Sequence, residues 1–257
     1  MRDSLQLAGA SMAVHDFRAQ RLYCDVPLHP GADIQCPADQ SNYLINTLRM
    51  GLGDEILVFN GREGEWLTEI TGVKKKASTL TAKEQVREQS GGPDIEYYFA
   101  PLKRARLDYM VQKATEMGAA RIHPVYTAHT VPNRVNVERL QANIIEAAEQ
   151  CGILHVPKGE QPEKLTRIIE TWDPTRILIF ADEAAEIASP IEALQSARNQ
   201  PVALIIGPEG GFSSEERDLL LRQPFTLRIS LGPRIMRADT AAVAALALVN
   251  AVIGDWR

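Results

Sequence analysis

The sequence predicts an α/β protein in two parts, a small N-terminal β domain and a larger C-terminal domain built on a parallel sheet. After residue 95, apolar segments of strand length alternate with helical patterns. Two of these segments, Arg176–Ala181 and Val202–Ile206, are apolar on both faces, which is typical of buried parallel strands. A polar break, QSGGPD at residues 89–94, indicates a linker. We therefore expect an extension over residues 1–19, a β domain over 20–88 and the parallel-sheet domain over 95–257.

Short alternating patterns before the linker indicate a mostly antiparallel sheet. The pair Asn60-Gly61 is a strong hairpin signal between two of them. One segment, Ala38–Met50, has helical spacing. The expected strands are Leu22–Val26, Gly53–Asn60, Trp66–Thr71, Lys76–Thr81 and Ala82–Arg87.

Beyond the linker, each expected strand is followed by a helix, as in βαβ units. The expected strands are Glu96–Ala100, Ala120–Tyr126, Arg176–Ala181, Val202–Ile206 and Thr226–Leu231. The expected helices are Arg106–Met117, Val137–Cys151, Glu163–Thr171, Pro190–Ala197, Ser214–Arg222 and Asp239–Ile253.

Composition points to a soluble protein of a reducing compartment. The 257 residues are 45% hydrophobic and 24% charged, and no apolar run is long enough to span a bilayer. Cys24, Cys36 and Cys151 lack the spacing of a zinc site or a redox pair, and the five histidines are scattered. We therefore expect a cytoplasmic protein without a metal or a membrane segment.

Charge alone gives little support for a nucleic-acid partner. The net charge is −5, which argues mildly against one. Residues 91–134, however, hold six Lys or Arg against four Asp or Glu, so this stretch is basic within an acidic protein. A basic strip of this kind is compatible with an RNA partner.

The first glycine loop, Gly207–Ser214, leaves an apolar strand and enters a helix. Ser213 or Ser214 is expected to cap that helix, with Glu216 near the third helical position. Its glycines free the backbone to turn sharply and to approach a ligand closely. In a doubly wound sheet, ligands bind at such carboxyl ends of strands. A tight, well-capped turn without a ligand explains the same residues equally well.

The second glycine loop, Leu231–Thr240, also follows an apolar strand and enters a helix. Asp239 or Thr240 is the expected N-cap. Ile235 and Met236 are large apolar residues in a loop, which suits contact with an adenine ring, although they could instead plug the core. Because both loops follow parallel strands near the C-terminus, we expect them to form one composite pocket for a small cofactor.

Several segments together resemble the SPOUT RNA methyltransferases, and most closely the family that methylates N3 of a uridine in 16S ribosomal RNA. The two loops, GPEGGFSSEE and LGPRIMRADTAAVAAL, resemble that family's cofactor loops. Ala100–Thr130 resembles its first strand, helix and second strand, and Ala147–Pro157 its Glu-Gln-Cys-Gly segment. Arg21–Asp25 and Leu48–Gly61 resemble its N-terminal PUA-like RNA-binding domain.

The resemblance implies a PUA-like β-barrel followed by a SPOUT domain with a deep trefoil knot at its C-terminus. It implies S-adenosylmethionine as cofactor, a homodimer with its active site at the interface, and 16S rRNA of the small ribosomal subunit as the partner. Asp239 stands where many members of the family have Glu, which makes a role for its side chain less secure. The implied cofactor-binding residues are Ile206, Gly207, Pro208, Glu209, Gly210, Gly211, Ser230, Leu231, Gly232, Ile235, Met236 and Thr240.

Uracil N3 carries a proton and attacks poorly until that proton leaves, so a cation that stabilises the uracil anion would speed the reaction. Arg237 is the candidate catalytic residue for this role, and no general base is evident, although Glu209 and Asp239 lie on the right loops. A target base must leave its stack to reach a pocket. The candidate RNA-binding residues are Arg21, Arg49, Lys103, Arg104, Arg106 and Arg234.

Two other functions remain open at this point. One is a protein that binds a nucleotide or phosphate at the first glycine loop through the following helix N-terminus. The other is a non-catalytic RNA-binding module, although RNA adhesion alone does not require an apolar, glycine-rich pocket.

Overall fold

The computed structural model describes residues 19–74, 77–132, 134–186 and 188–256, and the chain divides into two compact units after Glu88. Apart from Ala19, the expected N-terminal extension lies outside the described residues. No helix of the described part is long and apolar enough to cross a membrane.

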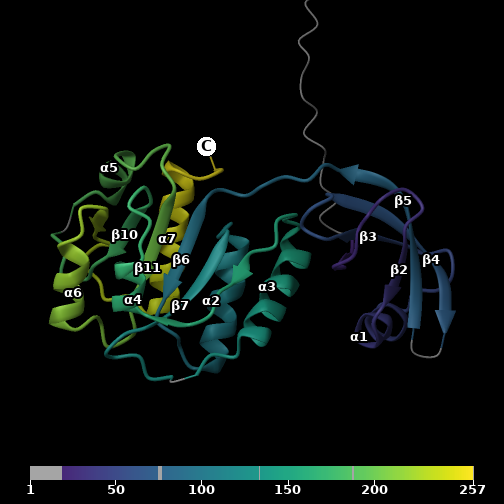
Figure 1. The fold of residues 1–257 in the computed structure, drawn as a ribbon, viewed down its shortest axis with the longest axis horizontal. Coiled ribbons are helices and arrows are strands. Elements are labelled where there is room, and N and C mark those ends of the chain that lie inside the picture. The colour runs from purple at the N-terminus through teal and green to yellow at the C-terminus, as the bar shows by residue number, and fades with distance from the viewer. Residues whose placement is uncertain (1–18, 75–76, 133, 187, 257) are drawn as a thin grey trace, which may run out of the picture. The chain divides into compact units, whose positions relative to one another are not determined.

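The N-terminal unit is built on a five-stranded sheet, in which Figure 1 labels β2, β3, β4 and β5. The strand order is β1-β3-β4-β5-β2. β3 and β4 form the antiparallel hairpin predicted at Asn60-Gly61, whereas β1 runs parallel to β3. The expected strands after residue 76 form a single strand. The short strand β2, which pairs with β5, was not predicted. The strands are β1 Arg21–Tyr23, β2 Asp33–Cys36, β3 Glu55–Phe59, β4 Glu65–Lys74 and β5 Ala77–Arg87.

The predicted helix Ala38–Met50 is shorter than expected and changes type along its length. It consists of α1, Ala38–Asn42, followed by a π-helical turn, Tyr43–Thr47. The wider turn lets the amide of Leu48 donate to the carbonyl of Tyr43. Arg49 then takes a left-handed backbone conformation with φ 59°, which ends the helical segment.

The C-terminal unit contains a parallel sheet in the order β12-β10-β11-β6-β7-β8, with β9 also paired to β7. The predicted α/β class with a parallel sheet is confirmed. Its strands are β6 Ile95–Phe99, β7 Arg121–Tyr126, β8 Lys158–Gly159, β9 Glu163–Lys164, β10 Ile177–Ala181, β11 Val202–Ile206 and β12 Thr226–Ile229. Its helices are α2 Arg104–Glu116, α3 Val137–Cys151, α4 Leu165–Glu170, α5 Pro190–Gln195, α6 Ser214–Leu221 and α7 Ala238–Val252.

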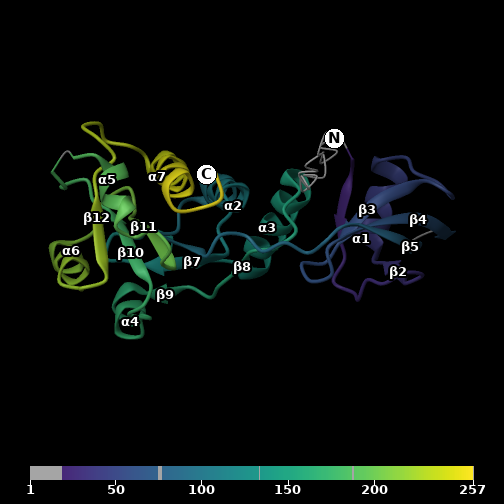
Figure 2. The ribbon, with the colours of Figure 1, turned by 90° about the horizontal axis from the view of Figure 1, so that it is seen from above.

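Helices cover both faces of this sheet (Figure 2). Tyr97 and Leu204 of the central strands pack with α2, α3, α5 and α7 on one face. Tyr98 and Ile205, their neighbours in the chain, pack with α4 and α6 on the other. Adjacent residues of a strand point to opposite faces, so the continuous apolar runs in the sequence are explained by burial on both sides.

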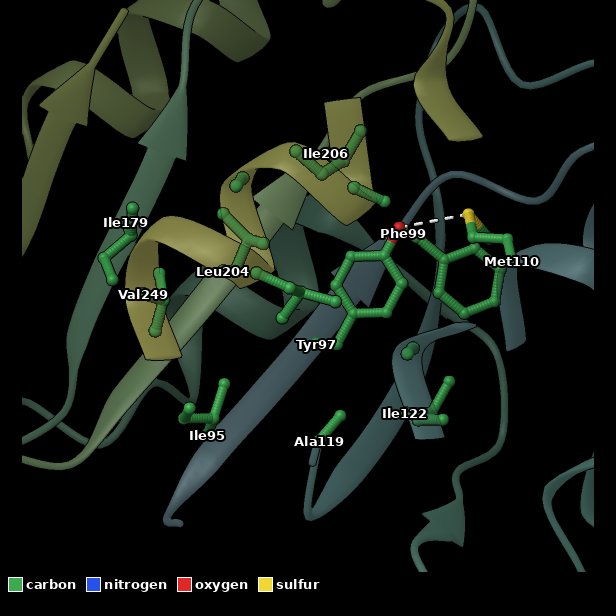
Figure 3. Close-up of a cluster of buried hydrophobic side chains, with 14 of the residues drawn as sticks. Ile95, Tyr97, Phe99, Met110, Ala119, Ile122, Ile179, Leu204, Ile206 and Val249 are labelled. Atoms are coloured by element: carbon green, nitrogen blue, oxygen red, sulfur yellow. Dashed lines mark hydrogen bonds between the residues drawn. The ribbon is translucent and has the colours of Figure 1, made fainter. Parts of the chain in front are cut away.

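In the core beside α2, two aromatic rings of β6 pack with a methionine of α2 (Figure 3). Tyr97 and Phe99 stack with ring centroids 5.5 Å apart. The Tyr97 hydroxyl, fully buried, donates to Met110 Sδ at 3.0 Å. Because a buried hydroxyl needs a partner, Met110 fixes α2 against the centre of the sheet.

At the amino end of the sheet, Glu96 lies among polar side chains from β6, from β7 and from the residue before β10. It accepts a hydrogen bond from the Tyr98 hydroxyl at 2.8 Å, and His123 Nε2 and an Arg176 nitrogen lie 3.3 Å and 3.5 Å from its oxygens. Burial raises the pKa of Glu96, but these partners outweigh it and lower the pKa to about 2. The cluster ties β6, β7 and β10 together at the end of the sheet opposite the glycine loops.

Several details differ from the predicted elements in this unit, and the short strand β8 was not predicted. The helix expected at Glu163–Thr171 begins only at Leu165, because Glu163 and Lys164 pair with β7. The last residues of the predicted linker pack onto the unit itself: a Cβ at Gly92 would lie 2.1 Å from the His155 ring, and Pro93 packs near Gly118.

Candidate active site

A pocket of about 400 Å³ opens at the carboxyl ends of β10, β11 and β12. Both glycine loops line it, as expected for a composite pocket. Its walls come from the segments 180–185, 206–212 and 230–241, with Arg217 of α6. This volume lies in the range of small-molecule sites, and the mixture of apolar side chains with free backbone groups is typical of them.

The first glycine loop is tightly held at its own ends. Ser213 caps α6 with a reciprocal capping box: its hydroxyl accepts from the Glu216 amide, and Glu216 accepts from the Ser213 amide. The prediction of this cap is confirmed. Gly211 has φ +70°, and a Cβ at Gly207 would lie 2.7 Å from the Phe212 ring, so both positions require glycine.

A turn after β7, Thr127–Thr130, also holds the first glycine loop. His129 Nδ1 lies 3.1 Å from the Gly210 carbonyl and 3.0 Å from that of Gly211. Since carbonyl oxygens only accept, Nδ1 carries the proton. The Ala128 amide donates to Glu216 at 2.7 Å, and Arg106 of α2 forms an ion pair with Glu209.

The second glycine loop has fewer internal bonds. The Gly232 amide donates to Ser230 Oγ at 3.2 Å, and Gly232 has φ +95°. Ile235 is 95% exposed at the mouth of the pocket, whereas Met236 is half-buried. Ile235 is therefore free to contact a ligand at the mouth of the pocket.

The predicted N-cap of α7 is wrong. The N-cap is Arg237, without a side-chain capping bond, and Asp239 and Thr240 already lie in the first turn. Asp239 Oδ2 instead accepts from Arg237 Nη2 at 3.1 Å, and its Oδ1 accepts from the Thr240 amide. A carboxylate in the first turn still stabilises the helix through the macrodipole. Asp239 therefore stabilises the start of α7, as predicted, but from the first turn and not from the N-cap.

The third wall of the pocket was missed from the sequence. Asp182 follows β10, and its side chain is 2% exposed beneath two arginines. Arg217 donates to it at 2.9 Å from α6, and Arg228 at 2.6 Å from β12. Burial raises the pKa of Asp182, but Arg217, the Ala184 amide and Arg228 outweigh it and hold the pKa below its usual value. An aspartate directly after an apolar strand was the available signal.

Of the predicted cofactor-binding residues, all but Gly210 and Thr240 line the pocket. Gly210 carries the carbonyl bound by His129, and Thr240 is exposed on α7.

The predicted cations fall into three groups. Arg234 lines the pocket, whereas Arg237, the candidate catalytic residue, is exposed at the start of α7 beside it. Lys103 and Arg106 are exposed at the start of α2 near the first glycine loop, and the side chain of Arg104 lies outside what is described.

The remaining two predicted cations lie in the N-terminal unit. Arg49 is exposed at the end of the π-helical turn. The assignment of Arg21 to RNA binding needs correction, because its side chain is 4% exposed and its Nε lies 2.8 Å from Glu65, which also pairs with Arg87. The buried ion pair between Arg21 and Glu65 therefore links β1 to β4, and the Arg21 guanidinium is not accessible to RNA. In the described part of the chain, no cluster of three His, Cys, Asp or Glu residues is placed to hold a metal.

Similarity to known proteins shows which class of protein combines this pocket with the separate β unit, the RNA methyltransferases. A sequence model of the RNA methyltransferase domain matches residues 90–250, and a model of the RNA methyltransferase PUA domain matches residues 37–83. Ribosomal RNA small subunit methyltransferase E of Rickettsia conorii is 31% identical over 232 residues, with 90% of this chain and 94% of that protein covered. The chain therefore belongs to the ribosomal RNA small subunit methyltransferase E family.

Solved structures agree with this assignment. A Legionella pneumophila protein with bound cofactor SAM (S-adenosylmethionine) has a TM-score of 0.81 at 30% identity, with 93% of this chain and 99% of that chain covered. Ribosomal RNA small subunit methyltransferase E of Neisseria gonorrhoeae, bound to S-adenosylmethionine, has a TM-score of 0.80 at 23% identity, with 93% and 100% covered. The SPOUT-type fold with a PUA domain is thereby confirmed, and the knot stays a prediction.

Proposed function

We propose that this protein transfers a methyl group from S-adenosylmethionine to N3 of a uridine in 16S rRNA of the small ribosomal subunit. The observation that carries the proposal is the composite pocket of the two glycine loops, found in a chain of this family. The resemblance of those loops to the uracil-N3 family gives the position of methylation.

The residues of the pocket fit S-adenosylmethionine. Ile206, Leu231 and Met236 supply apolar contacts for an adenine ring, and the exposed Ile235 would gain cover from one. Free backbone groups of the second glycine loop can read the edge of the ring. The Legionella relative, 30% identical, carries this cofactor. When bound, it supplies an activated methyl group.

The chain's own residues position and activate the uracil. Arg234 and Arg237 place two guanidinium groups beside the second glycine loop. Either can stabilise negative charge on the carbonyl oxygens of uracil once the N3 proton has left. We assign this role to Arg237, because Arg234 already lines the cofactor pocket. Asp239, bonded to Arg237 Nη2 at 3.1 Å, orients the guanidinium and is a positioning residue.

A phosphate ligand at the first glycine loop is disfavoured by the start of α6. The Ser213 and Glu216 amides are already bonded within the capping box, and Glu215 adds a second acidic side chain to the first turn. Two carboxylates repel an anion at a helix N-terminus. The nucleotide-binding alternative therefore has weaker support than the methyltransferase.

We further infer a homodimer that pairs through α2 and α7, and a cytoplasmic location where ribosomal subunits are assembled. On α7, Val243, Ala244 and Ala247 are apolar but only half-buried. Tyr109 on the neighbouring α2 is 47% exposed. An apolar surface of this kind gains from burial against a second copy. We also propose that the C-terminal unit contains the trefoil knot implied by the resemblance to SPOUT methyltransferases.

The test of the proposed function combines ligand binding with methyl transfer. S-adenosylhomocysteine should raise the Tm of the protein, whereas inorganic phosphate should not. Labelled S-adenosylmethionine should label one uridine in small subunits that lack the modification. No thermal shift at millimolar ligand would reject the cofactor, and label on another base or on transfer RNA would reject the substrate.

Arg237→Ala tests the proposed catalytic role. We expect turnover to fall by about 10²–10³-fold, the usual cost of losing one group that stabilises an anionic transition state. S-adenosylhomocysteine affinity should stay within about threefold, since Arg237 does not line the pocket. Arg222→Ala, an exposed arginine on α6, is the matched control. Normal turnover of the Arg237 variant would remove this residue from the mechanism.

A further inference from the structure

A second cavity of about 440 Å³ lies beside the cofactor pocket, between α2, α3 and the segment that joins β7 to α3. Three leucines, Leu102, Leu107 and Leu140, line it, and the cations Lys103, Arg134 and Arg139 surround them. None of its described lining residues belongs to the cofactor pocket.

The cations of the cavity differ in their availability. Arg139 is occupied, because it forms two bonds to Asp108, at 3.1 Å and 2.5 Å. Lys103 and Arg134 are exposed, and neither has an ion-pair partner among the described residues. One carboxylate against three cations leaves the cavity with a net positive charge.

We propose that this cavity binds a nucleotide of the RNA substrate that flanks the methylated uridine. An apolar wall suits the face of an unstacked base, and the two available cations suit its phosphates. The volume is adequate for one nucleotide and falls in the range of ligand sites. This proposal rests on the proposed methylation of a uridine in 16S rRNA. It gives the position on the protein of the RNA next to that uridine.

Position supports the same assignment, because two segments that flank the second cavity also contact the first glycine loop. Lys103 precedes α2, whose first turn reaches the first glycine loop through the Arg106–Glu209 ion pair. The turn Thr127–Thr130 bonds to that loop through His129, and the chain then runs directly into Val131 and Arg134 of the second cavity. A strand with its target base at one pocket can therefore place a neighbouring nucleotide in the other.

The test uses the full-length protein, a short RNA carrying the target site and small ribosomal subunits. Arg134→Ala and Lys103→Ala should each weaken RNA binding and raise KM about 5–50-fold, with kcat within about twofold. The slope of log affinity against log salt should fall by about one for each lost phosphate contact. Val131→Asp, at a side chain that is 72% exposed, should weaken binding further without disturbing the core.

Controls separate this proposal from the proposed function. Arg222→Ala should leave RNA binding and KM unchanged, and every variant should bind S-adenosylhomocysteine as the wild type does. If both cation variants kept wild-type RNA affinity and KM, the proposal that the second cavity binds a flanking nucleotide would be wrong. The proposed methyltransferase function would be unaffected by that result. Dissociation of a dimer by these variants would assign the cavity to a second copy of the chain. No methyl transfer and no RNA binding by the wild-type protein would reject both proposals.

Discussion

The two glycine loops line one pocket but are stabilised in different ways. The first has a capping box, a left-handed glycine and bonds from His129, Ala128 and Arg106 of two neighbouring segments. The second has a bond from Gly232 to Ser230 and local bonds from Arg237 and Thr240 to Asp239, and α7 starts without a side-chain cap. The first loop is therefore preformed, whereas the second gains most from contact with a ligand.

This difference suggests a division of labour. A preformed loop lowers the entropy lost on binding, so the first glycine loop should govern cofactor affinity. The more weakly held second loop carries Arg234, Ile235 and the start of α7 with Arg237. It should order on binding of the cofactor and place its arginines for the uracil.

Asp182→Ala should have the largest effect, because this carboxylate anchors both loops through Arg217 and Arg228. Loss of a buried partner costs about 3–5 kcal/mol, and the one-third exposure of both arginines reduces the expected loss to about 2–3 kcal/mol. Calorimetry should give a Tm lower by roughly 5–10 °C. Asp218→Ala, on exposed α6 surface, is the control, and an equal Tm for both variants would contradict the anchoring role.

Glu216→Ala should have the second largest effect on stability, and this effect should be confined to the first glycine loop. The variant loses the acceptor for the Ser213 amide and the acceptor for the Ala128 amide, at a cost of about 1–2 kcal/mol, while the backbone amide of residue 216 still donates to Ser213. Asp239→Ala in the second loop should cost less, up to about 1 kcal/mol, because its ion-pair partner Arg237 is 59% exposed. Urea unfolding of the two variants measures the difference, and equal losses would mean that the loops are held alike.

Gly232→Ala should have a smaller effect, confined to the second glycine loop. A side chain there meets no atom within 4 Å, so only the left-handed backbone at φ +95° opposes it, with a cost of about 1 kcal/mol. Calorimetric titration with S-adenosylhomocysteine should show a several-fold loss of affinity. Gly51→Ala, in open space without a left-handed φ, should leave affinity and stability unchanged. An unaffected Gly232 variant would show that the loop rearranges freely.

Glu96→Gln should have the smallest effect on the pocket, since Glu96 lies at the opposite end of the sheet. The folded pKa of Glu96 is about 2, below its usual 4.5, so its ionised form stabilises the fold. This contribution is present above pH 4.5 and is lost as the pH falls from there toward 2. Unfolding free energy of the variant should therefore fall less than that of the wild type over this range, and parallel pH profiles would contradict the assignment. Ligand affinity should not change.

Sequence patterns were most informative where local chemistry and burial agree. The helix Val137–Cys151 and the strand Val202–Ile206 have the predicted bounds. The helix has an Asn136 cap and ends at Gly152 with φ 71°, and the strand is buried at every residue. The Ser213 cap was predicted correctly for the same reason, since its partner lies three residues away.

Features set by distant contacts could not be predicted in this way. Nothing near Arg21 in the chain indicates its burial, because its partner Glu65 comes from another strand. Asp182 meets Arg217 and Arg228 only after β10, α6 and β12 have assembled. The short pairings at Lys158–Gly159 and Glu163–Lys164 depend on the edge of β7 and have no local signal.

The register of the parallel sheet also orders events during synthesis. β6 pairs with β7 on one side, but its other neighbour is β11, where Ile95 faces Val202. The centre of the sheet therefore stays open until most of the chain has left the ribosome, and α7 completes the core last. The N-terminal unit, whose pairs all lie before residue 88, can fold much earlier. Until β11 has been made, β6 lacks one of its two neighbouring strands, so apolar residues at the centre of the sheet stay exposed during synthesis.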